Sequence, residues 1–427
     1  MALVVKNGRL INPATGEDKI CDIRIDGTKI TAIGPDVDIQ DADILDATGL
    51  VVTPGLIDMH VHLRQPGQSA KETIESGTKA AAAGGFTRVA TMPNTKPVID
   101  SAIIVDGLKY KIADEGVVKV DIIGSLSKGL EGKELSSMGS MAKAGVVAFS
   151  DDGRYVQNCD FMRKAMEYAG MFGKIVIDHC EDADLIEDGH MHEGVVSHEL
   201  GLKGRPAVAE DIAVARDILL AEATGTAVHI AHISTKNAVQ MVRQAKAKGL
   251  KVTAEATPQH MILTDEALRS YDPRFKVNPP LRSEEHRKAV VEGLVDGTID
   301  AIVTDHAPHT IEEKDCEFSL APSGFVGLET SLGTVLTYLY HTGIVDLMTL
   351  IRTMTSSPAA LLGVDAGNVA VGKTADLTIM DLNKEWTVDS DKFYSKGKST
   401  PFEDMILKGK AVATIVDGKI VMKDGEV

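Results

Sequence analysis

The middle of the chain alternates short strand-like segments with longer helical ones, and this alternation limits the possible folds most strongly. Eight runs rich in apolar and β-branched residues lie at 55–60, 88–92, 118–124, 146–149, 175–178, 227–231, 251–256 and 301–304. Helical patterns lie between them, at 72–83, 102–115, 137–144, 160–172, 210–224, 235–248 and 284–294. Eight β–α units predict an α/β fold of the (β/α)8 TIM-like barrel type, whose chemistry gathers at the C-terminal ends of the strands. An open, doubly wound sheet is the structural alternative.

The two ends of the chain have a different sequence pattern. Residues 2–52 form short alternating apolar and polar runs separated by turn residues such as Asp26-Gly27. The same alternation is found near the C-terminal end, in runs such as 412–416. This pattern is typical of antiparallel hairpins. Neither end offers enough strands to close a core alone. We therefore predict a small composite β-sandwich domain from residues 1–52 and 366–427, beside a catalytic barrel domain at residues 53–365.

Composition and charge exclude several classes of function. The 427 residues carry a formal net charge of −17, which argues against a nucleic-acid or anionic-membrane partner, because either needs a basic surface. The chain has no run of about 18 apolar residues and no signal-peptide pattern, so we expect a cytoplasmic protein that acts on a small molecule. The four cysteines include no CxxC pair, which predicts neither a disulfide framework nor a thiolate metal site.

Two histidines, His60 and His62, stand where the first barrel strand ends. Residues two apart on a strand point to the same face, so both imidazoles can bind one ion such as zinc. Further metal-binding residue types follow other strands, at Asp151, Asp152, His179, His232 and Asp305. One catalytic zinc uses about three protein ligands, so this set favours two ions. Asp152 or Asp151 would bridge them, and the pair would activate a water molecule near neutral pH.

Several longer motifs surround these residues. They are His60-Val61-His62-Leu63-Arg64-Gln65-Pro66-Gly67, Met92-Pro93-Asn94-Thr95, Ser150-Asp151-Asp152-Gly153, the strands that end at His179 and His232, Val277-Asn278-Pro279-Pro280-Leu281-Arg282 and Asp305-His306-Ala307-Pro308-His309. Together they resemble the class I dihydroorotases of the amidohydrolase superfamily, and the resemblance runs essentially from end to end. It implies the reversible cyclisation of N-carbamoyl-L-aspartate to L-dihydroorotate, a step of pyrimidine biosynthesis.

The resemblance also implies a set of metal ligands. It implies two zinc ions per chain, although manganese and cobalt accept the same ligands. One ion would be bound by His60, His62 and Asp305, the other by His179 and His232, with Asp152 as the bridge. Many relatives use a carboxylated lysine as the bridge, but no lysine stands at this strand end. Asp305 would also carry a proton to the ring nitrogen of the substrate.

We expect substrate recognition at the same strand ends. A substrate carboxylate needs a local positive charge in an acidic protein, and Arg64 offers a rigid two-pronged donor. Asn94 can add an amide hydrogen bond. The resemblance implies further contacts from His62, Asn278, His309, Ser323 and Gly324. Simpler readings stay open, in which Asn94 forms a turn, Asn278 stabilises its loop and Arg64 makes a surface ion pair.

Two stretches of the chain depart from the motifs of the family, and a third is unusually polar. The ring-binding loop of the family commonly reads Pro-Phe-Gly, whereas this chain has Pro322-Ser323-Gly324. The seventh strand of many relatives ends in Thr-Pro-His-His, whereas this chain has Thr257-Pro258-Gln259-His260, and we expect His260 to be a packed or capping residue. The polar segment 310–322 could be a mobile loop over the site.

Two other functions share parts of this residue pattern. The first is another cyclic amidase, a hydantoinase or allantoinase, which does not need the pair of Arg64 and Asn94 and typically carries the bridging lysine. The second is a non-catalytic scaffold of the same ancestry, which usually loses metal ligands, whereas all six are present here. The resemblance further implies a homo-oligomer, and it leaves an association with aspartate carbamoyltransferase open.

Overall fold

Eight parallel strands form a barrel at the centre of the computed structural model, which describes residues 2–427. The strands are β6 (Leu56–Val61), β7 (Phe86–Thr91), β8 (Lys119–Gly124), β9 (Ala148–Phe149), β10 (Ile175–Asp178), β13 (Val228–Ile230), β14 (Val252–Ala256) and β15 (Ala301–Ile302). Neighbours in the sequence are neighbours in the sheet, and Val61 pairs with His306 beyond the last strand, which brings the ends together. The predicted (β/α)8 barrel is confirmed, and the doubly wound alternative is not.

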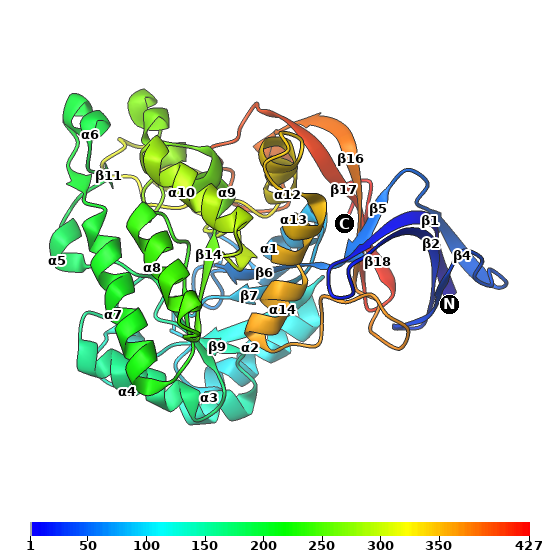
Figure 1. Ribbon diagram of the computed structural model, residues 1–427, viewed down its shortest axis with the longest axis horizontal. Helices are drawn as coiled ribbons and strands as arrows, with labels where there is room; N and C mark the ends of the chain where they lie inside the picture. Colours follow the sequence, from blue (N-terminus) through cyan, green and yellow to red (C-terminus); the bar gives the residue numbers. More distant parts are fainter. Residues whose placement is uncertain (1) are drawn as a thin grey trace.

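Helices surround the barrel (Figure 1). Those that were predicted are α1 (Ile74–Gly84), α2 (Ala102–Glu115), α3 (Met138–Ala144), α4 (Cys159–Gly170), α7 (Val208–Thr224), α8 (Lys236–Ala247) and α10 (Glu284–Val295). Their ends follow local capping chemistry. In α1 the Thr73 hydroxyl accepts a hydrogen bond from the amide of Ser76, and Gly85 ends the helix with φ 92°.

Shorter elements lie in the connections and after the barrel. Those in the connections are η1 (Lys128–Leu130), α5 (Ala183–Ile186), β11 (Met191–His192), α6 (Val195–Leu200), β12 (Gly204–Arg205), α9 (Pro258–Ile262), η2 (Asp265–Ser270) and η3 (Pro273–Phe275). Those after the last barrel strand are α11 (Ile311–Lys314), α12 (Ser331–Val335), the π-helix η4 (Leu336–Tyr340), α13 (Leu347–Thr353), α14 (Ser356–Leu362) and η5 (Ser390–Lys392). No helix of residues 2–427 combines the length and the apolar character needed to cross a bilayer.

A second sheet is built from both ends of the chain. Its strands are β1 (Ala2–Asn12), β2 (Glu17–Asp26), β3 (Lys29–Gly34), β4 (Ala42–Asp46), β5 (Val51–Pro54), β16 (Leu377–Thr387), β17 (Ile406–Val416) and β18 (Lys419–Lys423). The predicted composite of both termini is therefore present. Besides the expected antiparallel pairs, β1 pairs in parallel with β4 and β5, which lie one after the other along the same edge of this long strand. The residue limits of the two domains stay a prediction.

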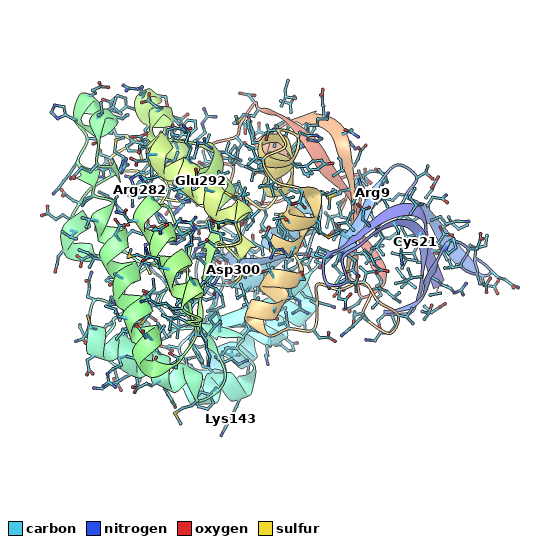
Figure 2. The ribbon with its side chains drawn as sticks, in the orientation of Figure 1. Arg9, Cys21, Lys143, Arg282, Glu292 and Asp300 are labelled. Carbon is cyan, nitrogen blue, oxygen red and sulfur yellow. The ribbon has the colours of Figure 1, made fainter. Side chains whose placement is uncertain are left out.

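Each sheet has an apolar core of its own. Inside the barrel lie small and medium side chains, among them Met59, Ile123 and Ile177, whereas the terminal sheet buries a separate aliphatic set that includes Ile23 and Ile415. In Figure 2, Arg9 and Cys21 mark the terminal sheet and Asp300 marks the barrel. The barrel core leaves the C-terminal ends of the strands free to carry polar side chains.

Candidate metal centre and substrate pocket

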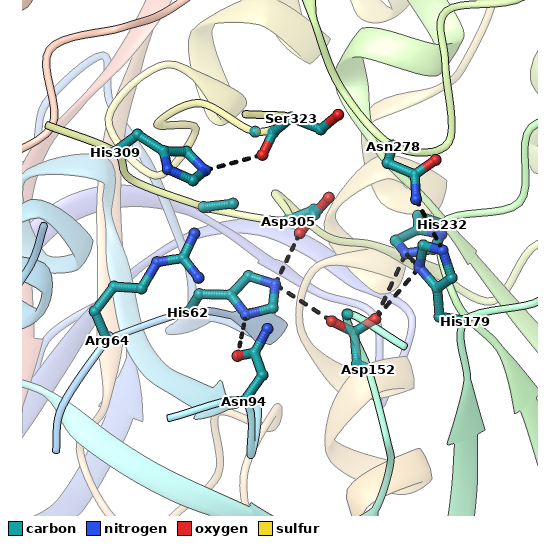
Figure 3. A pocket seen from close by; sticks show the side chains of 13 residues that line it. His62, Arg64, Asn94, Asp152, His179, His232, Asn278, Asp305, His309 and Ser323 are labelled. Atoms are coloured by element: carbon teal, nitrogen blue, oxygen red, sulfur yellow. Dashed lines mark hydrogen bonds and ion pairs between the residues drawn. The ribbon is translucent and has the colours of Figure 1, made fainter. Parts of the chain in front are cut away.

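Six polar side chains converge at the C-terminal ends of the barrel strands. They are His60, His62, Asp152, His179, His232 and Asp305, and all are buried. We call this set the metal centre. Five of its members line a cavity of about 210 Å³, and Figure 3 shows them facing one another there. The residues predicted to bind metal are thus brought together from five separate strands.

One half of the centre is formed by His60, His62 and Asp305. The Asp305 Oδ1 atom lies 3.5 Å from His60 Nε2 and 3.2 Å from His62 Nε2. Ligand atoms that surround a tetrahedral zinc with bonds of about 2.0–2.2 Å are separated by roughly 3.4 Å. The three atoms therefore have the spacing of ligands to one ion.

Asp152 lies between this half and the other two histidines. Its Oδ2 atom is 3.5 Å from His60 Nε2 and 3.4 Å from His62 Nε2. Its Oδ1 atom is 3.7 Å from His179 Nδ1 and 3.6 Å from His232 Nε2. One carboxylate oxygen thus faces each half, which is the arrangement that a bridging ligand requires.

The neighbouring Asp151 has a different role. Its Oδ1 atom accepts hydrogen bonds from the amides of Leu126 and Ser127 at 2.8 and 3.0 Å, and its Oδ2 atom accepts from the Ser127 hydroxyl. Asp151 therefore caps the loop after β8 and faces away from the histidines. Of the two candidate bridges in the sequence, Asp152 is the one with the required position.

The charges of the centre fit a bound cation. Among the described residues, His60 Nε2 and Asp152 Oδ1 are buried without a hydrogen-bond partner, a costly state for polar atoms. Burial opposes ionisation, yet His60, His179 and His232 lower the pKa of Asp152 overall, and Asp152 and Glu181 raise the pKa of His179 to about 10 despite its burial. The negative potential that favours a proton on these rings also favours a divalent ion.

Three residues of the site have a left-handed backbone. Arg64, His232 and Asp305 have φ values of 61°, 27° and 50°. Such conformations cost about 1–3 kcal/mol each for residues other than glycine, and they persist only where the surrounding structure enforces them. Each of the three follows a barrel strand, so the barrel wall aims these side chains into the cavity.

Arg64 is a buried cation without a carboxylate partner. Its side chain lines the cavity, and its Nε–H donates to the Pro308 carbonyl at 3.1 Å. No carboxylate oxygen of residues 2–427 lies within 4.0 Å of its nitrogens. Burial lowers the pKa of this guanidinium, because the charge is removed from water. The reading of Arg64 as a surface ion-pair residue does not fit this position.

Both predicted asparagines line the cavity and also lie next to histidine rings. Asn94 Oδ1 is 2.9 Å from His62 Nδ1, so the amide accepts a hydrogen bond from the ring and keeps its NH2 group available. Asn278 donates to Glu181 Oε2 at 3.0 Å and accepts from Arg205 Nη1 at 2.6 Å. Each asparagine therefore orders the site in addition to any contact with substrate.

The loop at 307–324 forms another wall of the cavity. His309 donates from Nε2 to the Ser323 carbonyl at 2.9 Å. Gly324 has φ 116°, and a Cβ atom there would lie 2.9 Å from the side chain of Ala307, so the close approach requires glycine. The Lys314 ammonium donates to the carbonyls of Pro322 and Gly324 at 3.0 and 2.9 Å. These hydrogen bonds hold the polar segment 310–322 against the wall of the cavity.

Two glutamates of the site were missed in the sequence. Glu181 accepts from Asn278 and lies 3.4 Å from His179 Nε2, and Glu255 Oε1 lies 2.5 Å from His60 Nδ1. A signal existed for each, because Glu181 follows a predicted ligand by two residues and Glu255 is the single charge near the end of an apolar strand.

His260 is packed as expected, with Nδ1 beside Thr257 Oγ1 and Nε2 donating to the Pro279 carbonyl.

Comparison with known proteins places the chain in a family. The Dihydro-orotase-like family matches residues 49–238, and the Amidohydrolase family matches residues 330–422. The dihydroorotase of Pelotomaculum thermopropionicum is 53% identical over 99% of this chain and 99% of its own length. The dihydroorotase of Geobacter metallireducens is 51% identical over 99% of this chain and 100% of its own length.

Solved structures of related enzymes have the same fold. The L-hydantoinase (dihydropyrimidinase) of Arthrobacter aurescens superposes with a TM-score of 0.90 at 28% identity, covering 100% of this chain and 97% of that one. The dihydropyrimidinase of Brevibacillus agri superposes with a TM-score of 0.89 at 24% identity, over 100% and 96% of the two chains. With relatives about half identical along the whole sequence, this chain belongs to the dihydroorotase family of metal-dependent cyclic amidohydrolases.

Proposed function

We propose that the protein is a dihydroorotase that interconverts N-carbamoyl-L-aspartate and L-dihydroorotate. The observation that carries this proposal is the buried Arg64 guanidinium, which lies beside the metal centre without a carboxylate partner among residues 2–427. A buried cation of this kind is stabilised by an anionic ligand. Dihydroorotate supplies such a carboxylate next to a cyclic amide, whereas hydantoin and allantoin do not.

The metal centre would hold two ions, with zinc as the first candidate. His60, His62 and Asp305 would bind one ion, His179 and His232 the other, and Asp152 would bind both; the paired spacings of Asp152 and the unpartnered His60 Nε2 atom support this assignment. When bound, the ions supply a water molecule acidic enough to attack near neutral pH and polarise the ring carbonyl.

Asp305 is the candidate proton carrier. Its Oδ1 atom faces the histidines, and its second oxygen points away from them toward the cavity (Figure 3). In the hydrolytic direction this carboxylate accepts a proton from the attacking water and delivers it to the departing ring nitrogen. In the direction of cyclisation it accepts the proton of the attacking carbamoyl nitrogen and delivers it to the departing hydroxide, which leaves as water.

The remaining wall residues would orient the ring. Arg64 and the free NH2 group of Asn94 reach the substrate carboxylate from one side of the cavity, and Asn278, His309 and the backbone at Ser323-Gly324 border the other. Burial and the nearby Arg64 and lysine charges lower the pKa of His309 to about 3, so its ring is neutral and serves as a hydrogen-bonding group. This arrangement fixes which face of the ring meets the metal centre.

A three-substrate assay tests the proposal. The zinc-loaded protein is supplied with L-dihydroorotate, hydantoin and allantoin, and kcat/KM is measured for each. We expect dihydroorotate to be preferred by roughly 10–100-fold, since a hydrogen-bonded charge pair is worth about 1.5–3 kcal/mol. A preference for hydantoin, the substrate type of the structurally similar hydantoinases, would make the protein a hydantoinase instead. A zinc-loaded protein inactive on all three would support the scaffold reading.

We also propose the cellular setting that this activity implies. The enzyme would serve pyrimidine biosynthesis in the cytoplasm as a homo-oligomer, and aspartate carbamoyltransferase, which makes N-carbamoyl-L-aspartate, is the candidate partner. Size-exclusion chromatography with light scattering would give the oligomeric state, with and without that enzyme. A monomer at micromolar concentration would contradict the proposed homo-oligomer.

A further inference from the structure

Glu255 lies directly behind the metal centre, inside the barrel. It belongs to β14, is fully buried, and has a hydrogen-bonding partner for each carboxylate oxygen. Its Oε1 atom is 2.5 Å from His60 Nδ1 and 3.3 Å from the backbone amide of His232. One carboxylate therefore contacts a residue from each half of the centre.

The other oxygen of Glu255 continues into a hydrogen-bonded column. Oε2 lies 3.1 Å from His229 Nε2, and His229 Nδ1 lies 2.7 Å from the Thr253 hydroxyl. Thr253 lines a second cavity of about 640 Å³, whose other lining residues include Ile175, Ala227 and Lys251 at the N-terminal ends of the strands. The column thus runs along the barrel interior from the metal centre toward its opposite end.

These contacts decide how His60 can act as a ligand. A carboxylate accepts a hydrogen bond, so Glu255 keeps the ring proton of His60 on Nδ1 and leaves the Nε2 lone pair free to face Asp152 and Asp305. The bond to the His232 amide supports a backbone with φ 27°, which would otherwise be unfavourable. His229 donates to Glu255 and accepts from Thr253, so every member of the column is satisfied.

We propose that Glu255 is a positioning residue, which fixes the tautomer of His60 and the backbone of His232 for metal binding, and that His229 and Thr253 orient Glu255. The inference rests on the proposed metal centre, but not on the identity of the substrate. None of the three residues touches the substrate cavity. Their effect would therefore appear in metal affinity before it appears in substrate selectivity.

The test is a graded series of variants, Glu255→Gln, His229→Asn and Thr253→Val, with zinc affinity measured by competition against a chromogenic chelator in the absence of substrate. We expect Glu255→Gln to lower the zinc affinity of at least one of the two proposed sites by about 10–100-fold. A loss of this size is typical when a hydrogen-bond partner of a metal ligand is removed. His229→Asn should cause a smaller loss, and Thr253→Val the smallest.

Glu329→Gln is the control, because Glu329 is a partly buried glutamate that accepts only from the amides of Tyr394 and Ser395, at 3.2 Å, among residues 2–427. It should leave zinc affinity unchanged. Unchanged affinity in Glu255→Gln, or an equal loss in Glu329→Gln, would overturn the proposal. If Glu255→Gln does not fold, as judged by circular dichroism, His229→Asn is held to the same criterion. Failure of dihydroorotate turnover alone would contradict the proposed function and not this role.

Discussion

Two buried polar clusters in this barrel have ligand-like spacing, and only one of them calls for a metal ion. The metal centre combines histidines with aspartates, and both clusters contain buried side-chain atoms without a hydrogen-bond partner among residues 2–427. The second cluster, which we call the arginine cluster, consists of Asp178, Cys180, Asp217 and Arg216. Its Cys180 Sγ lies 3.2 Å from Asp217 Oδ2 and 3.7 Å from Asp178 Oδ2.

The difference between the clusters is the internal cation. Arg216 Nη2 lies 3.0 Å from Asp178 and 2.6 Å from Asp217, so the guanidinium forms an ion pair with each carboxylate. It also stacks on the ring of Tyr155 at 4.4 Å. The metal centre has no such group among the described residues, because Arg64 faces the cavity instead. Spacing alone therefore does not identify a metal site, whereas spacing together with uncompensated charge does.

The largest effect is expected from Asp305→Ala, which removes the proposed metal ligand and the proposed proton carrier together. Turnover of dihydroorotate should fall by about 10³-fold or more even with excess zinc, since proton transfer alone contributes about 10²–10⁴-fold. The measurement is kcat at saturating substrate. Asp217→Asn, in the arginine cluster, should stay within a few-fold of the unmodified enzyme. Comparable losses in both variants would erase the distinction between the clusters.

Arg216→Met should act on stability and not on metal. Removing one partner of a buried ion pair costs about 3–5 kcal/mol, because the remaining charge is left unpaired. Chemical denaturation should show this loss in the free energy of unfolding, while the folded variant keeps its metal content. The control is Arg243→Met, because Arg243 pairs with Asp296 at 2.7 Å on the surface and should contribute about 1 kcal/mol or less. Metal loss in Arg216→Met would show that the arginine cluster also supports the metal centre.

Arg64→Met should chiefly weaken substrate binding. A hydrogen-bonded charge pair is worth about 1.5–3 kcal/mol, which corresponds to a rise in KM of roughly 10–100-fold with a smaller change in kcat. Steady-state kinetics on dihydroorotate measure both constants. An unchanged KM would remove Arg64 from the role of carboxylate partner, and the unpaired guanidinium would need another explanation.

The partly buried Glu329 shows a third way to hold a carboxyl group away from water, by binding a proton. Burial raises the pKa of Glu329 to about 8, and its hydrogen bonds from backbone amides offset this only in part. The folded state then holds a proton that the unfolded state loses above its ordinary pKa, so this contribution to stability declines as pH rises toward about 8. The slope should be at most about 1.4 kcal/mol per pH unit. Unfolding measured from pH 5 to 8 should lose this slope in Glu329→Gln, and an identical slope in the variant would refute the assignment.

The barrel and the group of histidines and aspartates at its strand ends could be predicted because both follow from short-range rules. Apolar runs bounded by capping residues gave the strands and helices, and the strand-end rule of barrels selected His60, Asp152, His179 and Asp305 from many similar residues. Local patterns could not distinguish Asp151 from Asp152, because adjacent residues after a strand differ only in the direction they point. That direction depends on the loop after β8, which is distant in sequence.

Contacts between distant strands were beyond such rules. The pairing of Glu255 with His60 joins residues 195 positions apart, and an acidic residue in an apolar strand looks the same whether it serves a ligand or an ion pair. The parallel pairing of β1 with β4 and β5 depends likewise on how the terminal strands meet. The arginine cluster was also invisible, since its cation comes from a helix and its carboxylates from a helix and a strand.

The most direct test of the contrast between the clusters is anomalous diffraction at the zinc edge from crystals of the zinc-loaded protein. Two peaks should flank the Asp152 carboxylate, one among His60, His62 and Asp305 and the other beside His179 and His232, with no peak at Asp178, Cys180 and Asp217. A single peak, or any zinc within the arginine cluster, would contradict the account.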